Sequence, residues 1–222
     1  MKTRLLSGAS FGVMAALVGI MGLASAEPAL GVEEPLAITV LVANYSQASP
    51  AVLAAAEREA GRILSGAGLR TVWLECRVGS TASKPQGPCE RAAEATDIRL
   101  RVLAAPIQKE FGHIAFGFTF HPVLASVYYE LVVRRAKSGD FELEVPTILG
   151  CAIAHELGHL LLGPNGHSAG GIMQGQWDPK QLHMALMGGL VFTSQQSKVL
   201  RAAARARIEH QKDGLSSPSS TQ

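Results

Sequence analysis

The stretch PTILGCAIAHELGHLLLG, residues 146–163, decides the fold of this 222-residue chain. The proline near its start and Gly163-Pro164 at its end predict a helix over residues 146–162. Nearly every side chain in this helix is apolar, and a helix that is apolar on all sides is typically buried. The other elements of the chain are therefore expected to pack around it.

Three polar side chains interrupt the apolar helix: His155, Glu156 and His159. Histidines four residues apart project from one face of a helix, so both can reach one metal ion. Glu156 lies beside them and can address a water at the metal without ligating the metal itself. Burying three such groups without partners is costly, and a metal ion satisfies all three. The helix therefore predicts one catalytic Zn²⁺, with His155 and His159 as ligands and Glu156 as general base.

The third ligand must come from outside this pair, because a catalytic zinc usually has three protein ligands and one open position. No glutamate occurs between Glu156 and Glu209, so a glutamate from a neighbouring helix is not expected. His167 follows a glycine-rich turn that can reverse the chain and return a side chain to the metal. His167 is therefore the expected third ligand, with Asp178 and His183 as alternatives.

These residues resemble the metzincin clan of zinc peptidases, and its matrixin branch in particular. In that clan the motif HExxHxxGxxH or HExxHxxGxxD lies on the active-site helix and its extension, and a later methionine forms a turn beneath the metal. The residues that carry the resemblance here are HELGHLLLGPNGHS, residues 155–168, and GIM, residues 171–173.

The resemblance implies that His155, His159 and His167 hold the metal, that Glu156 is the general base, and that Met173 lies at the base of the site. The glycine comes one residue later than in the clan's pattern, and the third histidine two residues later. The chain is therefore described as a divergent metzincin-like peptidase that acts on peptide or protein substrates.

The remaining pattern predicts an α+β fold with a mixed β-sheet that begins with a β-α-β unit. Ser49 and Pro50 open the helix of that unit as N-cap and first helical residue. A glycine inside a strand, as at Gly117, indicates a bulge or a close backbone approach. The expected strands are residues 36–45, 71–76, 97–103 and 114–120, and the expected helix of the β-α-β unit is residues 50–64. The pattern of residues 125–136 is compatible with helix or strand, and helix is favoured.

Two more helices are predicted after the central one. Residues 179–187 form a short helix, and Thr193 with Gln196 forms a capping box for a last helix that ends near Ile208. The peptidase domain is expected over residues 27–210, and residues 211–222 are expected to be a disordered tail.

The first 26 residues have the pattern of a signal peptide. Lys2 and Arg4 precede an apolar stretch over residues 11–23, and Ala24-Ser25-Ala26 matches a cleavage site. Cleavage after Ala26 would yield a secreted or periplasmic protein. No membrane span is expected in the mature chain, because polar residues interrupt the one later apolar segment.

The cysteines fit an exported protein. Cys76 and Cys89 flank a loop rich in small and polar residues, and a disulfide between them is expected. Cys151 lies in the apolar helix, where a buried free thiol is the common state.

The composition narrows the possible functions. With 47% hydrophobic and 17% charged residues the chain is globular, and a net charge of +2 argues against a nucleic-acid partner. Two other functions stay open: a zinc amidase or deformylase-type hydrolase, in which a cysteine can be the third ligand, and a catalytically silent zinc-binding interaction module. The sequence predicts no particular oligomeric state.

Overall fold

The computed structural model describes residues 36–78, 87–106, 116–120, 122–138, 144–163 and 165–216. All of them belong to one compact unit, Glu34–Gln222. The predicted signal peptide, residues 1–26, lies outside the described residues. The elements, in chain order, are β1 (Ala37–Tyr45), α1 (Pro50–Gly66), β2 (Arg70–Cys76), β3 (Asp97–Leu103), β4 (Gly117–Phe120), β5 (Leu124–Tyr128), α2 (Tyr129–Ser138), α3 (Val145–Leu162), α4 (Pro179–Leu186) and α5 (Ser194–Ser216).

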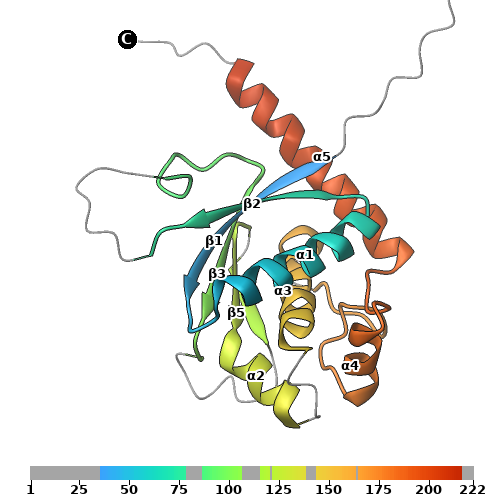
Figure 1. The fold of residues 1–222 in the computed structure, drawn as a ribbon. Coiled ribbons are helices and arrows are strands. Elements are labelled where there is room, and N and C mark those ends of the chain that lie inside the picture. The colour runs from blue at the N-terminus through green and yellow to red at the C-terminus, as the bar shows by residue number, and fades with distance from the viewer. Residues whose placement is uncertain are drawn as a thin grey trace, which may run out of the picture. The chain divides into compact units, whose positions relative to one another are not determined.

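The five strands form one mixed sheet in the order β2-β1-β3-β5-β4 (Figure 1). The pairs β1–β2, β1–β3 and β3–β5 are parallel, and β4 runs antiparallel to β5 at the edge of the sheet. The opening β1-α1-β2 unit confirms the predicted β-α-β arrangement, and the α+β class is confirmed as well.

Local signals fix the start of α1 as predicted, and the helix ends at Gly66, two residues later than predicted. The Ser49 side chain accepts a hydrogen bond from the backbone N–H of Val52, and Pro50 occupies the first turn. After the helix, Gly68 has a φ of +88°, which a residue with a Cβ rarely adopts. The chain can therefore turn directly into β2.

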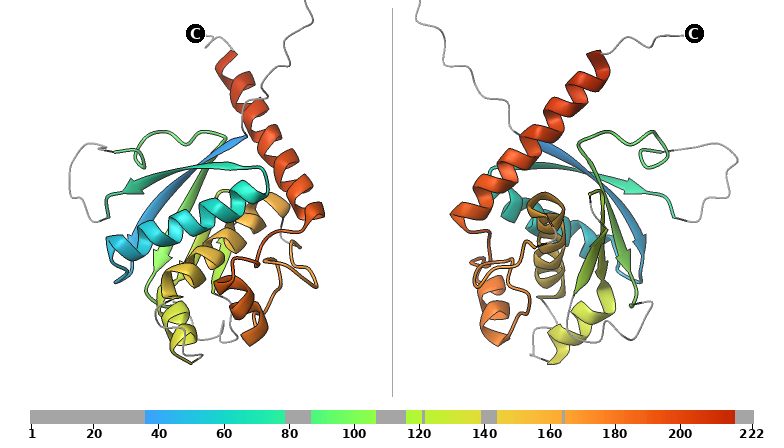
Figure 2. Two further views of the ribbon diagram at one scale, coloured as in Figure 1. Left: turned by 45° about the vertical axis from the view of Figure 1, so that its right-hand side comes forward. Right: turned by 180° about the vertical axis from the view of Figure 1, so that it is seen from behind.

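Helices α1 and α3 lie side by side against one face of the sheet (Figure 2). Alternate residues of each central strand point into this layer, as in Ile38, Val40 and Val42 of β1, which are at most 3% exposed. From Ile148 to Leu161, every residue of α3 is buried. The helix predicted from residues 146–162 is thus the central core helix.

The same helix is, among the described residues, the one that is long and apolar enough to cross a membrane. Most of it, 83%, is buried inside the domain. Its apolar composition is therefore accounted for by packing against the sheet and the other helices.

One predicted element is wrong at its start. Residues 125–136 were expected to form a single helix, but β5 continues to Tyr128 and α2 begins only at Tyr129. Ala125 and Val127 are fully buried towards the helices, and β5 pairs with strands on both sides. Pairing on both edges overrides a sequence pattern that is equally compatible with helix.

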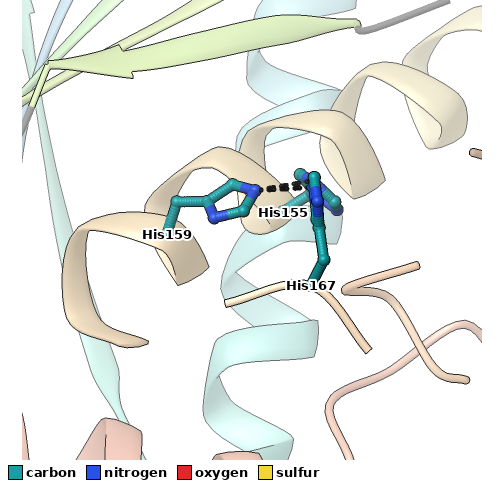
Figure 3. Close-up of side chains that lie close together, drawn as sticks. All are labelled: His155, His159 and His167. Carbon is teal, nitrogen blue, oxygen red and sulfur yellow. Dashed lines mark hydrogen bonds between the residues drawn. The ribbon is translucent and has the colours of Figure 1, made fainter. Parts of the chain in front are cut away.

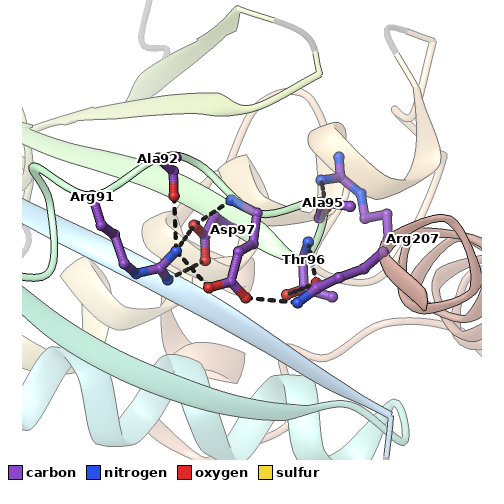
Figure 4. Close-up of polar contacts among 8 residues, drawn as sticks. Arg91, Ala92, Ala95, Thr96, Asp97 and Arg207 are labelled. Atoms are coloured by element: carbon purple, nitrogen blue, oxygen red, sulfur yellow. Dashed lines mark hydrogen bonds and ion pairs between the residues drawn. The ribbon is translucent and has the colours of Figure 1, made fainter. Parts of the chain in front are cut away.

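The last helix is longer than predicted, since α5 runs to Ser216 instead of ending near residue 208. Residues 211–216 are therefore helical and not a disordered tail, and residues 217–222 lie outside the described residues. Contacts with the loop before β3 explain the extension. In that loop, the Ala95 carbonyl oxygen accepts a hydrogen bond from Arg207 (Figure 4), and the Thr96 hydroxyl donates to the side-chain oxygen of Gln211. Arg207 also donates to the carbonyl oxygen of Pro122, between β4 and β5.

That loop is itself held by an ion pair between the buried carboxylate of Asp97 and the partly exposed side chain of Arg91. The Asp97 carboxylate is 2% exposed and lies 2.8 Å from the Arg91 guanidinium (Figure 4). It also accepts the backbone N–H of Glu94 at 2.8 Å. The buried charge therefore has both an ionic and a backbone partner, as buried carboxylates require.

The predicted disulfide between Cys76 and Cys89 is present, and Cys151 is a buried free cysteine. The bridge joins the end of β2 to the segment that leads into β3. The two cysteines are 13 positions apart in the sequence. The bridge closes the loop between them and thereby restricts the unfolded chain.

The crossing of α1 and α3 gives the first testable prediction. Gly150→Ala should lower the free energy of unfolding by about 1–3 kcal/mol through overpacking. An added Cβ would lie 2.6 Å from the Cβ of Glu59 and 2.7 Å from the carbonyl oxygen of Ala56. The control is Gly66→Ala in α1, where a Cβ meets nothing within 4 Å and should raise stability by up to about 1 kcal/mol. Urea unfolding of both variants measures the difference, and equal stabilities would contradict the close contact.

Candidate metal centre and active site

Two histidines of α3 and one from the following loop converge at one point (Figure 3). His155 and His159 are 9% and 8% exposed, whereas His167 is exposed. The Nε2 atom of His159 lies 3.1 Å from the Nε2 atoms of both His155 and His167. The available ligand atoms of the three residues all lie within 4.8 Å of one another.

This arrangement fits a zinc ion. Zn–N bonds of about 2.0–2.1 Å at tetrahedral angles place ligand nitrogens about 3.3 Å apart. Burial, followed by smaller effects of neighbouring histidines, lowers the pKa of both His155 and His159 to about 4. Both rings are therefore neutral at pH 7, which is the state in which imidazole binds metal.

Backbone groups fix the two buried rings. The Nδ1 atom of His155 lies 2.7 Å from the carbonyl oxygen of Ile172, which can only accept. Nδ1 therefore carries the proton, and the Nε2 lone pair points to the other two histidines. The backbone at Gly163 lies close enough to His159 to raise the pKa of that ring, against the larger lowering by burial. Each buried histidine thus has a backbone group beside it, away from the point where the three rings meet.

A glycine-containing turn returns His167 to the helix. Gly163 follows α3 with a φ of +90°, and the N–H of Gly166 donates to its carbonyl oxygen at 3.1 Å. A Cβ on Gly166 would lie 3.2 Å from Nδ1 of His159, and one on Gly175 would lie 3.2 Å from Nδ1 of His167. The chain passes so close to both rings that bulkier residues would have to displace them.

Glu156 lies beside the histidines and faces the edge strand. Its side chain is 5% exposed, and burial raises its pKa to about 8. A Cβ on Gly117 of β4 would lie 2.8 Å from the Cγ atom of Glu156. The close backbone approach predicted for Gly117 is therefore made both to the carbonyl oxygen of Ser126 on β5, which a Cβ would meet first, and to this carboxyl group.

The histidines and Glu156 open into a cavity of about 350 Å³. Its other walls come from the edge strand and from the loop after His167. They include Phe116, Phe118 and Thr119 on one side, and Gln174 and Trp177 on the other. A group bound in this cavity would lie against β4.

Met173 packs against the part of α3 that carries the histidines. It is fully buried, and a Cβ on Gly158 would lie 2.7 Å from its sulfur atom. Gly158 directly precedes His159, so the thioether lies next to the turn of α3 that carries this histidine.

The alternative ligands have other roles or positions. The Asp178 carboxylate caps α4 by accepting the backbone N–H groups of Lys180 and Gln181. His183 is exposed on α4 and does not belong to the histidine group. Cys76 and Cys89 are bound to each other and cannot supply a thiolate. In the described part of the chain, His155, His159 and His167 are the one group of side chains placed so that they could hold a metal ion.

Sequence reasoning missed the carbonyl oxygen of Ile172 and the indole of Trp177. The Trp177 Nε1–H donates to that carbonyl oxygen at 3.3 Å. A backbone carbonyl has no sequence signal, and no motif in the sequence links Trp177 to His155. Only the folded loop brings these groups to His155.

The shifted pKa values predict how the stability of the zinc-free protein depends on pH. Glu156 and Glu57 have folded pKa values of about 8 and 7, each raised from 4.5, so their contribution is complete below pH 4.5 and is lost as pH rises. His155 and His159, lowered from 6.5 to about 4, act oppositely: their contribution is present above pH 6.5 and is lost as pH falls to 4.

Between pH 7 and 8, the loss should come mainly from Glu156. Glu57, with a folded pKa of about 7, is already half ionised at pH 7 and loses less, and the two histidines have nearly completed their change above pH 6.5. Glu156→Gln should therefore remove most of the fall in melting temperature over this interval, and Glu57→Gln should remove only a smaller part. Thermal unfolding of the zinc-free variants measures this. A fall of the same size in Glu156→Gln and wild type would contradict the buried carboxyl.

A comparison of the sequence with protein-family models and curated proteins finds no match. A comparison of folds finds the crystal structure of a zinc-dependent peptidase from Methanocorpusculum labreanum, with a TM-score of 0.51 and 13% sequence identity, covering 72% of this chain and 99% of that one. An archaemetzincin from Methanopyrus kandleri gives a TM-score of 0.46 and 14% identity, covering 78% and 99%. The first similarity shows that this chain shares its fold with a zinc-dependent peptidase.

Proposed function

We propose that this protein is an exported zinc-dependent endopeptidase of a divergent metzincin-like type. The observation that carries the proposal is the convergence of three histidine nitrogens within 4.8 Å, beside a buried glutamate at the edge of a sheet. His155, His159 and His167 would hold one zinc ion, and an open position would remain for water and substrate. The fold shared with a zinc-dependent peptidase supports the assignment.

Zinc, when bound, would polarise the scissile carbonyl and lower the pKa of a water molecule. Glu156 takes a proton from the attacking water and returns it to the leaving amine. Its raised pKa suits both steps, because a base with a pKa near the working pH can accept and release a proton. A nearby cation would favour the ionised carboxylate and so lower that pKa from about 8 towards the working pH.

The substrate class follows from the edge strand. β4 pairs with β5 on one side, and within the described part of the sheet no strand pairs with its other side. An extended peptide can add to such an edge through backbone hydrogen bonds. Gly117, Phe118 and Thr119 of β4 line the cavity with Glu156, so an added peptide would pass the reacting groups. Because a strand can extend past both ends of the site, cleavage within a peptide or protein chain is favoured.

The decisive test is a zinc and peptidase measurement on residues 27–222. Wild type should bind about one zinc per chain, and His167→Ala should lose or greatly weaken it. Glu156→Gln should keep the zinc but lose peptide hydrolysis by several orders of magnitude, because its amide cannot accept the proton. Zinc is measured by elemental analysis and hydrolysis with a quenched peptide library.

Each outcome of these two measurements points to a different function. A folded wild type that binds no zinc, even after reconstitution, would refute the hydrolase. Zinc binding without hydrolysis of any peptide would favour the silent interaction module, and hydrolysis of formyl or other simple amides alone would favour the amidase. The present observations favour the peptidase, because the cavity lies against β4, whose outer edge has no partner in the described part of the sheet.

Export is proposed from the N-terminal pattern and the disulfide. Lys2 and Arg4, the apolar residues 11–23 and the Ala24-Ser25-Ala26 triplet form a signal peptide, and the Cys76–Cys89 bridge suits an oxidising compartment. The full chain, expressed in a bacterium, should appear outside the cytoplasm with Glu27 as its first residue. N-terminal sequencing of that fraction measures this, and an uncut chain retained in the membrane would contradict it.

A further inference from the structure

We propose that Trp177 is a positioning residue for His155, acting through the carbonyl oxygen of Ile172. This inference rests on the proposed zinc function and adds a residue to it. The indole would hold the carbonyl in the direction from which it accepts the Nδ1 proton of His155. Trp177 thereby keeps the Nε2 atom of the first ligand aimed at the metal position.

Two donors meet at one acceptor. The Ile172 carbonyl oxygen lies 2.7 Å from Nδ1 of His155 and 3.3 Å from Nε1 of Trp177. A carbonyl oxygen has two lone pairs, so both hydrogen bonds can form at once. All three residues are buried, with Ile172 fully buried and Trp177 5% exposed. Water therefore cannot easily replace either donor.

The indole also contacts the ligand ring directly. The ring centroids of His155 and Trp177 lie 5.8 Å apart, with an interplanar angle of 82°. This edge-to-face geometry is a favoured one for aromatic pairs. Trp177 thus holds the carbonyl oxygen that accepts the His155 proton, and it also restricts the rotation of the imidazole ring.

Other elements hold Trp177 in this position. On one side its ring packs against Phe116, with centroids 5.3 Å apart. Its own carbonyl oxygen accepts a hydrogen bond from Arg135 of α2 at 3.3 Å. The next residue, Asp178, begins α4 through a capping box with Gln181. The backbone of Trp177 is therefore held by α2 and α4, so its side chain can act as a support for the loop.

Groups that orient a metal-binding histidine typically change metal affinity by 10–100-fold when they are removed. Trp177 is one step further from the metal position than the carbonyl oxygen of Ile172. We therefore expect its substitution to lower zinc affinity by a factor near the lower end of that range. Trp177 also lines the cavity, and a change in peptide hydrolysis alone could therefore come from lost substrate contacts. Zinc affinity separates the two, because a substrate contact does not affect it.

The test compares Trp177→Phe with Trp73→Phe in otherwise complete mature protein. Phenylalanine keeps an aromatic ring but has no N–H donor. Trp73 lies on β2, at the opposite edge of the sheet from β4, and gives the same chemical change away from the site. Zinc dissociation constants are measured by competition with a chromophoric chelator, and ligand geometry by the visible spectrum of the cobalt-substituted protein.

We expect Trp177→Phe to bind zinc about tenfold more weakly than wild type, with an altered cobalt spectrum, while Trp73→Phe matches wild type in both. Zinc affinity of Trp177→Phe within twofold of wild type would overturn the role of Trp177 and leave the proposed function standing. Absence of zinc binding in wild type would instead refute the proposed function itself.

If Trp177→Phe does not fold, a more conservative change decides the question. Benzothienylalanine, in which sulfur replaces the indole N–H, can be incorporated in place of tryptophan in the Trp73→Phe background, so that only position 177 is altered. This side chain keeps the size of the indole and removes only the hydrogen bond. Weaker zinc binding would support the role of Trp177, and unchanged zinc binding would overturn it.

Discussion

The structure depends on one constraint: α3 is buried on every side and carries three ionisable side chains at its centre. His155, Glu156 and His159 are each at most 9% exposed. Burial moves the two histidines and the glutamate towards their neutral forms, with pKa values of about 4 for the histidines and about 8 for the carboxyl group. A divalent cation would instead favour the ionised form of Glu156, and it would bind the neutral forms of the two histidines. The same burial explains why His155 has the backbone carbonyl oxygen of Ile172 as a partner.

Close packing around α3 then determines where small residues must occur. Gly150 lies against α1, and Gly158 against the sulfur of Met173. On the edge strand, Gly117 lies against Glu156. A Cβ at any of the three would come within 3.0 Å of an atom of its neighbour, which real structures almost never show. The position of the candidate base relative to the histidines is therefore set by backbone approach on several sides of one helix.

The parts that the sequence predicts well are those with local causes. The start of α1, the capping box of Thr193 and Gln196, and the extent of α3 depend on residues within one helical turn, and the structure has them as expected. The boundary between β5 and α2 could not be predicted, because it depends on pairing with strands distant in sequence. The extension of α5 likewise depends on Arg207 and Gln211 reaching the loop before β3.

The candidate site divides in the same way. Histidines four apart on a helix must share a face, so the pair on α3 follows from spacing alone. The return of His167 to that pair does not, because its loop could end in many places. Residues beyond the loop hold it: the N–H of Ser168 donates to the carbonyl oxygen of Met173, and the hydroxyl of Ser168 accepts from Gln196 of α5.

The loop that carries His167 is longer than in the pattern it resembles, yet its imidazole nitrogen lies 3.1 Å from that of His159. Gly166 accounts for part of this, since its backbone folds back onto Gly163 and onto the His159 ring. The N–H of Ile172 is in turn bound by the carbonyl oxygen of Val191, in the segment that leads into α5. Contacts outside the motif therefore hold the loop at its far end and bring His167 to the other two histidines despite the two additional residues. In this chain α2, α4 and α5 each contribute to holding the loop, so the position of the exposed His167 ring depends on elements that follow or precede the motif as well as on the motif's own spacing.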